Sequence, residues 1–561
     1  MISKSNYKNY PKEVPSHIKI PEITLSDMLK IVVENFSSRE AFICQGQKLS
    51  FKQVDEYSDI FAGYLQHKWR VKKGQHIAIM LPNLLQFPII IFALIKLGSV
   101  FININPLYTS QEVKGILKDS KATGIIVLSS LAHTVEAIAH QCDDLKHMMV
   151  TSIADLYSFP RKQIISFVAK YIKGMKDKYS RDKFDIFSDA INAGFVPDYS
   201  QIKVSPNDMA ALQYSSGTTG TPKGTILLHR NIVANVYQIR AWTDGFAIDL
   251  SKQIVIAALP LYHIFSLTAN LFTFYFSGAV QILIPNPKNI PSLVSQMVKS
   301  NFTTIFGVNT LYIALLNNKK FRKSKFANFK LSISGGMSTT ESVAKEWENV
   351  TSVQIKEGYG LSEMSPVVTV NPLDNEPFNN TVGFALPNTN ISIRDDKGNE
   401  LSHNEVGEIW VSGPQKSPGF WSLPEINKEH FTDDGWLKTG DMGYLDELGR
   451  LVISGRIKHM IIVSGFNVFP KEIELVLVDK QEIQDAAVVG ISSIESGQVP
   501  VAFIVLKPNQ KLTEKEIISH CATKLAHYKL PRKIIFKDEL PKNTVGKIDI
   551  KSLQEEAQKY R

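Results

Sequence analysis

The sequence predicts an α/β protein: a large N-terminal domain of layered α/β sheets with a small β-barrel, followed by a small α+β C-terminal domain. Three observations predict this fold. From about residue 25 to 455, short apolar runs of strand and helix character alternate, which is typical of layered α/β domains. Between about 380 and 455 the runs become short strands separated by turns, which predict the small β-barrel or, alternatively, a sheet closing the large domain. The rest of the chain mixes strands with helices. We expect domains at 1–457 and 458–561.

Length and composition indicate an ordinary globular protein with more than one domain. The chain has 561 residues, 44% of them hydrophobic and 21% charged. Three widely separated cysteines, Cys44, Cys142 and Cys521, support neither a disulfide framework nor a zinc site. They indicate a reducing, cytosolic setting. The net charge of +9 does not imply nucleic acid, because anionic small molecules or an anionic membrane surface would balance it equally.

The N-terminal part argues against export and against a membrane span. The first residues lack the apolar core of a signal peptide. The longest apolar stretch, 87–104, is interrupted by Lys96 and Gly98, and it predicts a buried helix followed by a strand. We expect a cytoplasmic protein whose membrane contact, if any, is peripheral and on the cytoplasmic face of the inner membrane.

A basic amphipathic helix is predicted at 160–183. Apolar residues recur there at helical spacing, and the other positions of the same turns carry Arg161, Lys162, Lys170, Lys173, Lys176 and Lys178. Such a helix can lie on an anionic bilayer, or it can be a solvated helix packed on its own domain. The sequence leaves both interpretations open.

The stretch YSSGTTGTPKG at 214–224 indicates a phosphate-binding loop. Its glycines allow close approach of a ligand, its hydroxyls donate hydrogen bonds, and Lys223 adds a positive charge. The spacing differs from a Walker loop, and the alternative is a polar hairpin between 209–214 and 225–229. The binding residues predicted in the loop are Tyr214, Ser215, Ser216, Gly217, Thr218, Thr219, Gly220, Thr221, Lys223 and Gly224.

The C-terminal part has its own alternation of elements. We expect strands at 486–491 and 501–506 and helices at 470–479 and 514–525. This mixture predicts a small α+β domain with its own core.

Seven further motifs occur in a fixed order along the chain. They are PLYHIF (260–265), SGGM (334–337), EGYGLSE (357–363), GEIWVSGP (407–414), WLKTGD (436–441), GRIKHMIIVSGFNVFP (455–470) and PKNTVGK (541–547). With the phosphate loop they resemble the adenylate-forming superfamily of acyl-CoA synthetases, luciferases and peptide-synthetase adenylation domains over nearly the whole chain. Segments such as PNLLQFP, NPLYT and GVNTLYIALLNN resemble bacterial long-chain fatty acyl-CoA synthetases most closely.

The resemblance implies a two-step reaction that uses ATP, Mg²⁺ and CoA. A fatty acid attacks ATP to give an acyl adenylate and pyrophosphate, and the acyl group then passes to the CoA thiol. The resemblance assigns the β- and γ-phosphates to Thr218, Thr219, Gly220 and Lys223, the α-phosphate to Ser362, and Mg²⁺ to Glu363. It assigns the adenine to Tyr359, with Gly335 and Gly336 allowing its close approach, and the ribose to Asp441 and Arg456. Gly358 and Gly360 are further expected nucleotide-binding residues.

Two lysines of the predicted C-terminal domain take part in the implied mechanism. Lys547 would bridge the carboxylate and the α-phosphate during adenylation, and Lys458 would be the hinge about which this mobile domain rotates between the steps. Gly465 and Phe466 would line the passage of the CoA arm, although an ordinary strand turn there is an alternative.

His263 and Val308 are expected in the substrate pocket. The carboxylate needs no base to attack, so we interpret His263 as a pocket residue or a core histidine rather than a catalytic base. Apolar residues at 305–316 either line an acyl tunnel or are plain core, so the acyl chain length is not predicted.

Three positions depart from the family pattern. Ser362 replaces the usual threonine and keeps its hydroxyl, and IDIK follows Lys547 where a basic pair is common. His459 replaces the aspartate after the hinge lysine and adds a group that ordinarily titrates near neutral pH.

The leading hypothesis is an ATP- and Mg²⁺-dependent long-chain fatty acid–CoA ligase. The alternatives are an adenylate-forming enzyme with another acid or acceptor, such as an aryl acid or a carrier-protein thiol, and a catalytically silent lipid-binding relative. Expected partners are fatty acid, ATP and CoA, without nucleic acid, and the sequence leaves a homodimer open.

Overall fold

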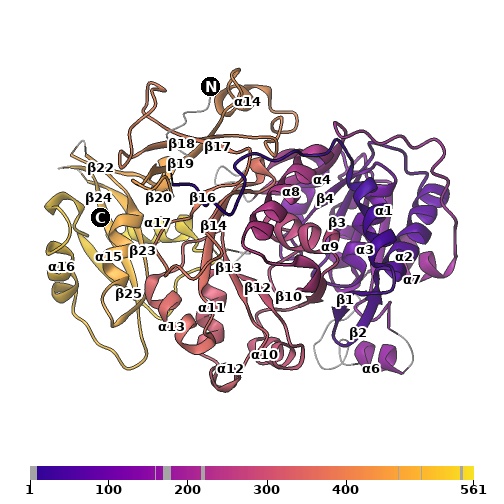
Figure 1. The fold of residues 1–561 in the computed structure, drawn as a ribbon, viewed down its shortest axis with the longest axis horizontal. Coiled ribbons are helices and arrows are strands. Elements are labelled where there is room, and N and C mark those ends of the chain that lie inside the picture. Colours follow the sequence, from indigo (N-terminus) through magenta and orange to yellow (C-terminus); the bar gives the residue numbers. More distant parts are fainter. Residues whose placement is uncertain are drawn as a thin grey trace.

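The computed structural model describes residues 9–157, 160–167, 179–215, 222–464, 466–493, 496–543 and 547–560. Its strands form four sheets, and the last sheet lies to one side of the others (Figure 1). The predicted α/β class is therefore confirmed. Among the described residues, no helix is long and apolar enough to cross a membrane.

The first large sheet has seven strands in the order β7-β6-β5-β3-β4-β8-β9. All neighbours are parallel except β8 and β9, which form an antiparallel hairpin. Its strands are β3 (His76–Met80), β4 (Val100–Asn103), β5 (Gly124–Leu128), β6 (His147–Thr151), β7 (Asp185–Ile186), β8 (Met209–Ser215) and β9 (Lys223–Leu228). Nearly continuous apolar runs such as residues 77–80 suit strands that are covered on both faces.

The second large sheet has nine strands in the order β16-β15-β14-β13-β12-β10-β11-β1-β2. Its central strands are parallel, and β2, β15 and β16 run antiparallel to their neighbours. The strands are β1 (Glu40–Cys44), β2 (Gln47–Ser50), β10 (Ile254–Ala257), β11 (Val280–Leu283), β12 (Thr304–Gly307), β13 (Leu331–Ser334), β14 (Ile355–Gly360), β15 (Val367–Val370) and β16 (Phe384–Ala385). The ends of β13 and β14 carry two of the predicted motifs.

Fourteen α-helices precede the last sheet in the described chain, and most of them pack on the two large sheets. They are α1 (Leu25–Phe36), α2 (Phe51–Tyr64), α3 (Gln86–Lys96), α4 (Ser110–Asp119), α5 (Ala132–Ala139), α6 (Arg161–Phe167), α7 (Phe187–Asn192), α8 (His229–Gly245), α9 (Thr273–Phe276), α10 (Ile290–Lys299), α11 (Asn309–Leu316), α12 (Lys319–Lys323), α13 (Glu341–Thr351) and α14 (Pro424–His430). The largest buried cluster joins α1, α2, α3 and α8 with strands of both large sheets.

The apolar stretch at 87–104 forms the predicted buried helix and strand, α3 and β4. Residues 86–95 of α3 are all buried, which explains its uniform apolar character. Lys96 ends the helix and its Nζ lies 2.6 Å from Asp55 Oδ1 and 2.7 Å from Asp59 Oδ1. The cation that interrupts the apolar stretch is thus paired rather than buried alone.

Among the described residues, the predicted small β-barrel is wrong and the alternative, a sheet, is what these strands form. The strands β17 (Asn390–Arg394), β18 (Gly407–Ser412), β19 (Leu437–Leu445) and β20 (Leu451–Arg456) form an open antiparallel sheet in that order. Instead of pairing with β17, β20 exchanges backbone hydrogen bonds through Leu451 with residues 382 and 383, which precede β16. This links the small sheet to the nine-stranded sheet.

The last sheet has the order β22-β21-β24-β23, with β25 paired to β24. Its elements are β21 (Ile461–Val463), β22 (Phe466–Val468), α15 (Pro470–Val478), β23 (Ile483–Ser493), β24 (Gly497–Leu506), α16 (Glu514–Ala522), β25 (Lys533–Lys537) and α17 (Ile550–Ala557). The strands and helices predicted in this region are confirmed. They enclose separate apolar clusters on the two faces of the sheet.

Candidate active site

The centre of the candidate site is the carboxylate of Asp441. Cross-strand pairing of β19 and β20 sets Asp441 opposite Arg456, and Arg456 Nε lies 2.7 Å from Asp441 Oδ1. The hydroxyl of Tyr359, on β14, donates to Asp441 Oδ2 at 2.6 Å. Three residues predicted to bind adenine and ribose therefore meet at one carboxylate.

The residues around Asp441 differ in how far their side chains are exposed to solvent. The Asp441 side chain is 5% exposed and that of Arg456 is 59% exposed, so the ion pair reaches the surface. Burial and the adjacent Asp441 carboxylate raise the pKa of Tyr359 well above its ordinary value, so its hydroxyl stays protonated and acts as a donor. The same carboxylate raises the pKa of Arg456.

Lys547 enters this group from the far end of the chain. A methyl group built on Gly336 would lie 3.7 Å from Lys547 Cε and 3.9 Å from its Nζ. Gly336 follows β13 and has a left-handed φ of +77°, which favours glycine. Burial, and secondarily Arg456, lowers the pKa of Lys547, while Asp441 opposes this shift.

Asn543 holds the backbone of Lys547 in place. The Lys547 N–H donates to Asn543 Oδ1 at 3.0 Å, and the Asn543 N–H donates to the Lys547 carbonyl at 2.7 Å. The sequence interpretation gave Asn543 no role, although it lies within the PKNTVGK motif. The pair fixes the base of the lysine side chain.

The glycines of the EGYGLSE motif serve the backbone of β14. A methyl group at Gly360 would lie 2.2 Å from the carbonyl oxygen of Pro366, and one at Gly358 would lie 2.9 Å from that of Thr369. Gly335 is packed against the ring of Phe265, because a methyl group built on Gly335 would lie 3.0 Å from the Phe265 Cζ atom. In this structure these three glycines allow close packing within the protein around Tyr359.

His263 is uncharged at neutral pH. Burial lowers its pKa to about 3, and the nearby Lys547 ammonium adds to the shift. Its Nδ1 accepts a hydrogen bond from the Phe265 N–H at 3.3 Å. The structure therefore brings His263 close to Lys547 as a neutral side chain. Val308 is partly buried and directly precedes α11, whose residues Leu311, Tyr312, Leu315 and Leu316 are buried in the core.

Ser362 and Glu363 lie on a short 3₁₀ turn after β14. The Glu363 carbonyl accepts from the Ser417 N–H at 2.8 Å. Burial raises the pKa of the Glu363 carboxyl, and Arg456 and His430 partly oppose the shift. No group of three or more histidine, cysteine or acidic residues that could hold a metal occurs in the described chain.

The loop at 214–224 joins β8 and β9, so its flanks form the hairpin that was the alternative interpretation. Ser216, Gly217, Thr218, Thr219, Gly220 and Thr221 lie outside the described residues. Lys223 begins β9, and its Nζ lies 5.6 Å from the ring centroid of Phe420. Tyr214 is 6% exposed, donates to Asp119 at 2.5 Å and packs against Gly224. Ser215 ends β8.

The predicted hinge follows β20. Lys458 is exposed on the 3₁₀ turn Ile457–His459. Burial, Arg456 and Lys458 lower the pKa of His459 below its ordinary value. Its imidazole is therefore neutral at a pH at which a free histidine would already be partly protonated. Phe466 is 55% exposed and stacks on Tyr528 at 4.7 Å, apart from the buried group around Asp441. Gly465 lies outside the described residues.

Glu357 is a buried carboxyl that the sequence interpretation did not single out. It directly precedes Gly358 on β14, is 4% exposed, and accepts from the Thr339 N–H at 2.6 Å. Burial raises its pKa to about 7, and the Thr339 N–H and Lys471 limit the shift. Lys471 belongs to α15, so this carboxyl interacts with the last part of the chain.

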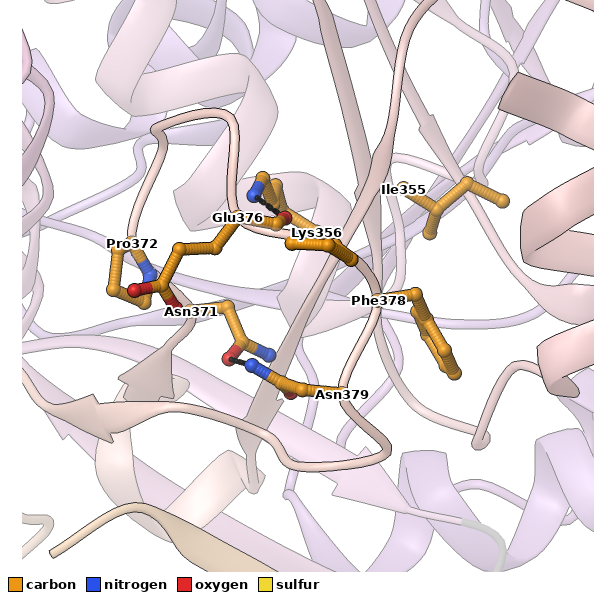
Figure 2. A pocket seen from close by; sticks show the side chains of 8 residues that line it. Ile355, Lys356, Asn371, Pro372, Glu376, Phe378 and Asn379 are labelled. Atoms are coloured by element: carbon orange, nitrogen blue, oxygen red, sulfur yellow. Dashed lines mark hydrogen bonds between the residues drawn. The ribbon is translucent and has the colours of Figure 1, made fainter. Parts of the chain in front are cut away.

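A small pocket lies near the start of β14, and Figure 2 shows its lining. Lys356 Nζ donates to the Glu376 carbonyl at 2.8 Å, and Asn379 donates to Asn371 at 3.3 Å. The cavity measures about 10 Å³, enough for about one water molecule. It is too small for a nucleotide, and none of the predicted site residues line it.

Comparison with known proteins identifies a family, a curated relative and a similar solved structure. The AMP-binding enzyme family matches residues 29–421, and the AMP-binding enzyme C-terminal domain matches residues 472–547. The chain is 41% identical over 549 residues to the long-chain-fatty-acid–CoA ligase of Escherichia coli O157:H7, covering 98% of this chain and 97% of that protein.

The fold is similar to that of MatB from Rhodopseudomonas palustris. For the ATP-bound crystal structure the TM-score is 0.83 with 26% identity, covering 96% of this chain and 100% of the other. For the apo structure of the same protein the TM-score is 0.75 over the same coverage, also with 26% identity.

Proposed function

Because the chain belongs to the AMP-binding enzyme family, we propose that it joins a long-chain fatty acid to CoA through an acyl adenylate, with release of pyrophosphate and AMP. The full-length similarity to a long-chain-fatty-acid–CoA ligase supports this choice of acid and acceptor. The observation that carries the proposal is the position of the half-buried Lys547 side chain beside Gly336, within the electrostatic influence of Asp441 and Arg456. A cation at that point is what the first step requires.

In the first step a fatty carboxylate oxygen attacks the α-phosphorus of ATP, and the bond to pyrophosphate breaks. Both reactants are negative, so catalysis rests on positioning and on stabilising charge rather than on a protein nucleophile. We assign the Lys547 ammonium to the carboxylate and α-phosphate, with Ser362 on the α-phosphate. Lys223 and the hydroxyl-rich loop before it are assigned to the departing pyrophosphate.

The nucleotide is assigned to the group around Asp441. Tyr359 and Arg456 each use one lone pair of a different Asp441 oxygen, so each oxygen keeps capacity to accept from a ribose hydroxyl. We place the adenine against the Tyr359 ring and the glycines at 335–336. His263, neutral and near Lys547, is assigned to the wall between adenylate and acyl chain together with Val308.

Glu363 is assigned as the protein ligand of Mg²⁺. Its desolvated carboxyl, with a raised pKa, would be stabilised as a carboxylate by an adjacent cation. A single carboxylate fits this ion, because Mg²⁺ commonly binds one or two carboxylates together with substrate phosphates and water. When bound, the ion would supply positive charge at the phosphates.

For the second step we propose that residues 458–561 rotate about Lys458 relative to residues 1–457. The higher TM-score with ATP-bound than with apo MatB supports an adenylation-like arrangement of the present structure. Lys547 beside Gly336 supports the same interpretation. Gly465 and Phe466, on the segment between β21 and α15, are assigned to the CoA arm after the rotation.

We propose a cytoplasmic enzyme with peripheral contact to the inner membrane, from which a fatty acid of low water solubility is drawn. Residues 168–178 of the predicted basic helix lie outside the described residues, and α6 covers only its beginning. The lipid contact is therefore considered separately below.

One assay tests the function. The protein is incubated with ATP, Mg²⁺ and fatty acids of short, medium and long chains, with and without CoA, while pyrophosphate and acyl-CoA are measured. We expect both products, with acyl-CoA only when CoA is present and the highest rates for long chains. Pyrophosphate without acyl-CoA would indicate another acceptor, an aryl acid preference would indicate another acid, and neither product would indicate a silent relative.

A further inference from the structure

A strongly basic surface segment lies at residues 319–330, and we call it the basic segment. Its sequence, KKFRKSKFANFK, contains five lysines and one arginine and no acidic residue. All six cations are exposed. The segment begins as the short helix α12 and continues to the start of β13.

The aromatic side chains of this segment anchor it to the core. Phe321 is fully buried and stacks on Trp347 with ring centroids 5.2 Å apart, and Phe329 is 6% exposed against the same tryptophan. Asn318 caps α12 by accepting from the Lys320 and Phe321 N–H groups. With its phenylalanines anchored inward, the segment displays its cations outward.

The cations are largely uncompensated by the protein itself. Within the described parts of the chain, the ion pair formed by the basic segment is that of Arg322 with Glu346 on α13. Lys299 at the end of α10 adds a further exposed cation nearby, because Phe302, which follows it, packs on Phe326 at 5.4 Å. Such a surface attracts an anionic partner.

The position of the basic segment relates it to the acyl pocket. Helix α11 begins directly after Val308, which we assign to that pocket, and ends two residues before the basic segment. Its eight residues span about 12 Å. In Figure 1, α10, α12 and α6 all lie along the lower edge of the molecule.

We propose that the basic segment is the surface by which this protein docks on bilayers containing anionic lipids. The reason to dock rests on the proposed function, since long-chain fatty acids partition into bilayers. Lysine-rich surfaces bind anionic leaflets through screened attraction without specific pairing. Single-stranded nucleic acid is the less favoured partner, because the phenylalanines that would stack on bases are buried at 321 and 329.

The test compares two triple variants of the full chain in co-sedimentation with vesicles. One is Lys319→Gln/Lys320→Gln/Lys323→Gln, and the control is Lys507→Gln/Lys511→Gln/Lys515→Gln, which removes the same charge from exposed positions around the end of β24 and the start of α16. Vesicles are of phosphatidylcholine alone or mixed with phosphatidylglycerol. We expect the first variant to lose at least about tenfold in affinity for the mixed vesicles, and the control to stay within about twofold.

Further outcomes separate the alternatives. Equal loss in both variants, or equal binding of the unchanged protein to neutral vesicles, would overturn the proposal. Loss only when Lys162, Lys170 and Lys173 are replaced by glutamine would assign docking to the 160–183 helix instead. Preferential binding of single-stranded DNA over mixed vesicles would also contradict it.

The activity of the same variants distinguishes this proposal from the proposed function. With a soluble medium-chain acid, both triple variants should match the unchanged protein, whereas with long-chain acid supplied in mixed vesicles the 319/320/323 variant should be slower. A protein that binds mixed vesicles through the basic segment but forms no acyl-CoA would contradict the proposed function and leave the docking surface standing.

Discussion

At the scale of single residues, the candidate site depends on the position of Lys547 beside Gly336. The Lys547 ammonium stands within van der Waals reach of the space above Gly336, in surroundings that lower its pKa. Desolvation of an ammonium group costs free energy, and an anionic reactant beside it would recover that cost. This cost is why we assign Lys547 to the reacting carboxylate and phosphate.

Lys547→Ala should therefore separate the two half-reactions. We expect the rate of adenylate formation, measured as pyrophosphate release, to fall at least about a hundredfold, because one preorganised charge is lost. Thioester formation from a supplied acyl adenylate should change only a few-fold. Lys542→Ala, at an exposed lysine of the same motif, is the matched control and should leave both steps intact. Equal loss of both steps in Lys547→Ala would count against the assignment.

Glu357 predicts a pH dependence of stability. Its pKa is about 7 in the folded protein against an ordinary value of 4.5, so between these values the folded state binds more protons than the unfolded state. The contribution of Glu357 to the free energy of unfolding therefore falls as the pH rises from about 4.5 to 7. Above about pH 7 this contribution no longer changes with pH. The shift corresponds to about 3 kcal/mol.

Glu357→Gln keeps an oxygen for the Thr339 N–H and removes the titration. We expect this variant to gain up to about 3 kcal/mol in stability over the unchanged protein at pH 8, with the difference vanishing near pH 4.5. Chemical denaturation across this pH range measures it, and Glu429→Gln at an exposed position is the control. A difference that does not vary with pH would show that Glu357 does not titrate in this window.

At the scale of elements, β19 and β20 align Asp441 with Arg456, and the chain leaves β20 through the short turn that contains Lys458. This turn connects the Asp441 group to the C-terminal part of the chain, in which Lys547 lies between β25 and α17. The exposed backbone there is a suitable place for rotation. Its neighbour His459 is neutral, so it adds little repulsion to Lys458 near neutral pH.

Lys458→Pro should impair the second step selectively. Proline fixes φ and restricts the preceding residue, so the rotation needed for thioester formation should be hindered. We expect thioester formation to slow at least about tenfold more than adenylation, whereas Lys458→Ala, which leaves the backbone free, should preserve the ratio of the two rates. Stopped-flow measurements of the separate steps test this. An unchanged ratio in the proline variant would remove Lys458 from the hinge.

At the scale of the whole molecule, two large sheets with parallel cores form one body, and the small C-terminal sheet delivers Lys547 to it. The open four-stranded sheet supplies Asp441 and Arg456, and β14 of the nine-stranded sheet supplies Tyr359. Lys223 begins β9 of the seven-stranded sheet, so the proposed site draws on all four sheets. Rotation of the C-terminal sheet would remove Lys547 from the other groups, as the proposed change between the two steps requires.

The sequence alone determined the α/β class, the buried helix at α3, the elements of the last sheet and the order of the motifs. These follow from local apolar periodicity and from residue chemistry at fixed spacing. It did not decide between a barrel and an open sheet at 390–456, and it favoured the barrel wrongly, because strand pattern does not specify which edges pair.

Only the tertiary structure decided which distant groups meet. It brought Tyr359 and Arg456 to Asp441 and Lys547 to Gly336, turned Tyr214 into the core against Asp119, and buried Glu357 within the electrostatic influence of Lys471 on α15. It also showed that the lysines at 319–330 point outward around anchored phenylalanines. The physical reason is that burial, pKa and contact are properties of surroundings built from remote parts of the chain, whereas periodicity and motif chemistry are carried by neighbouring residues.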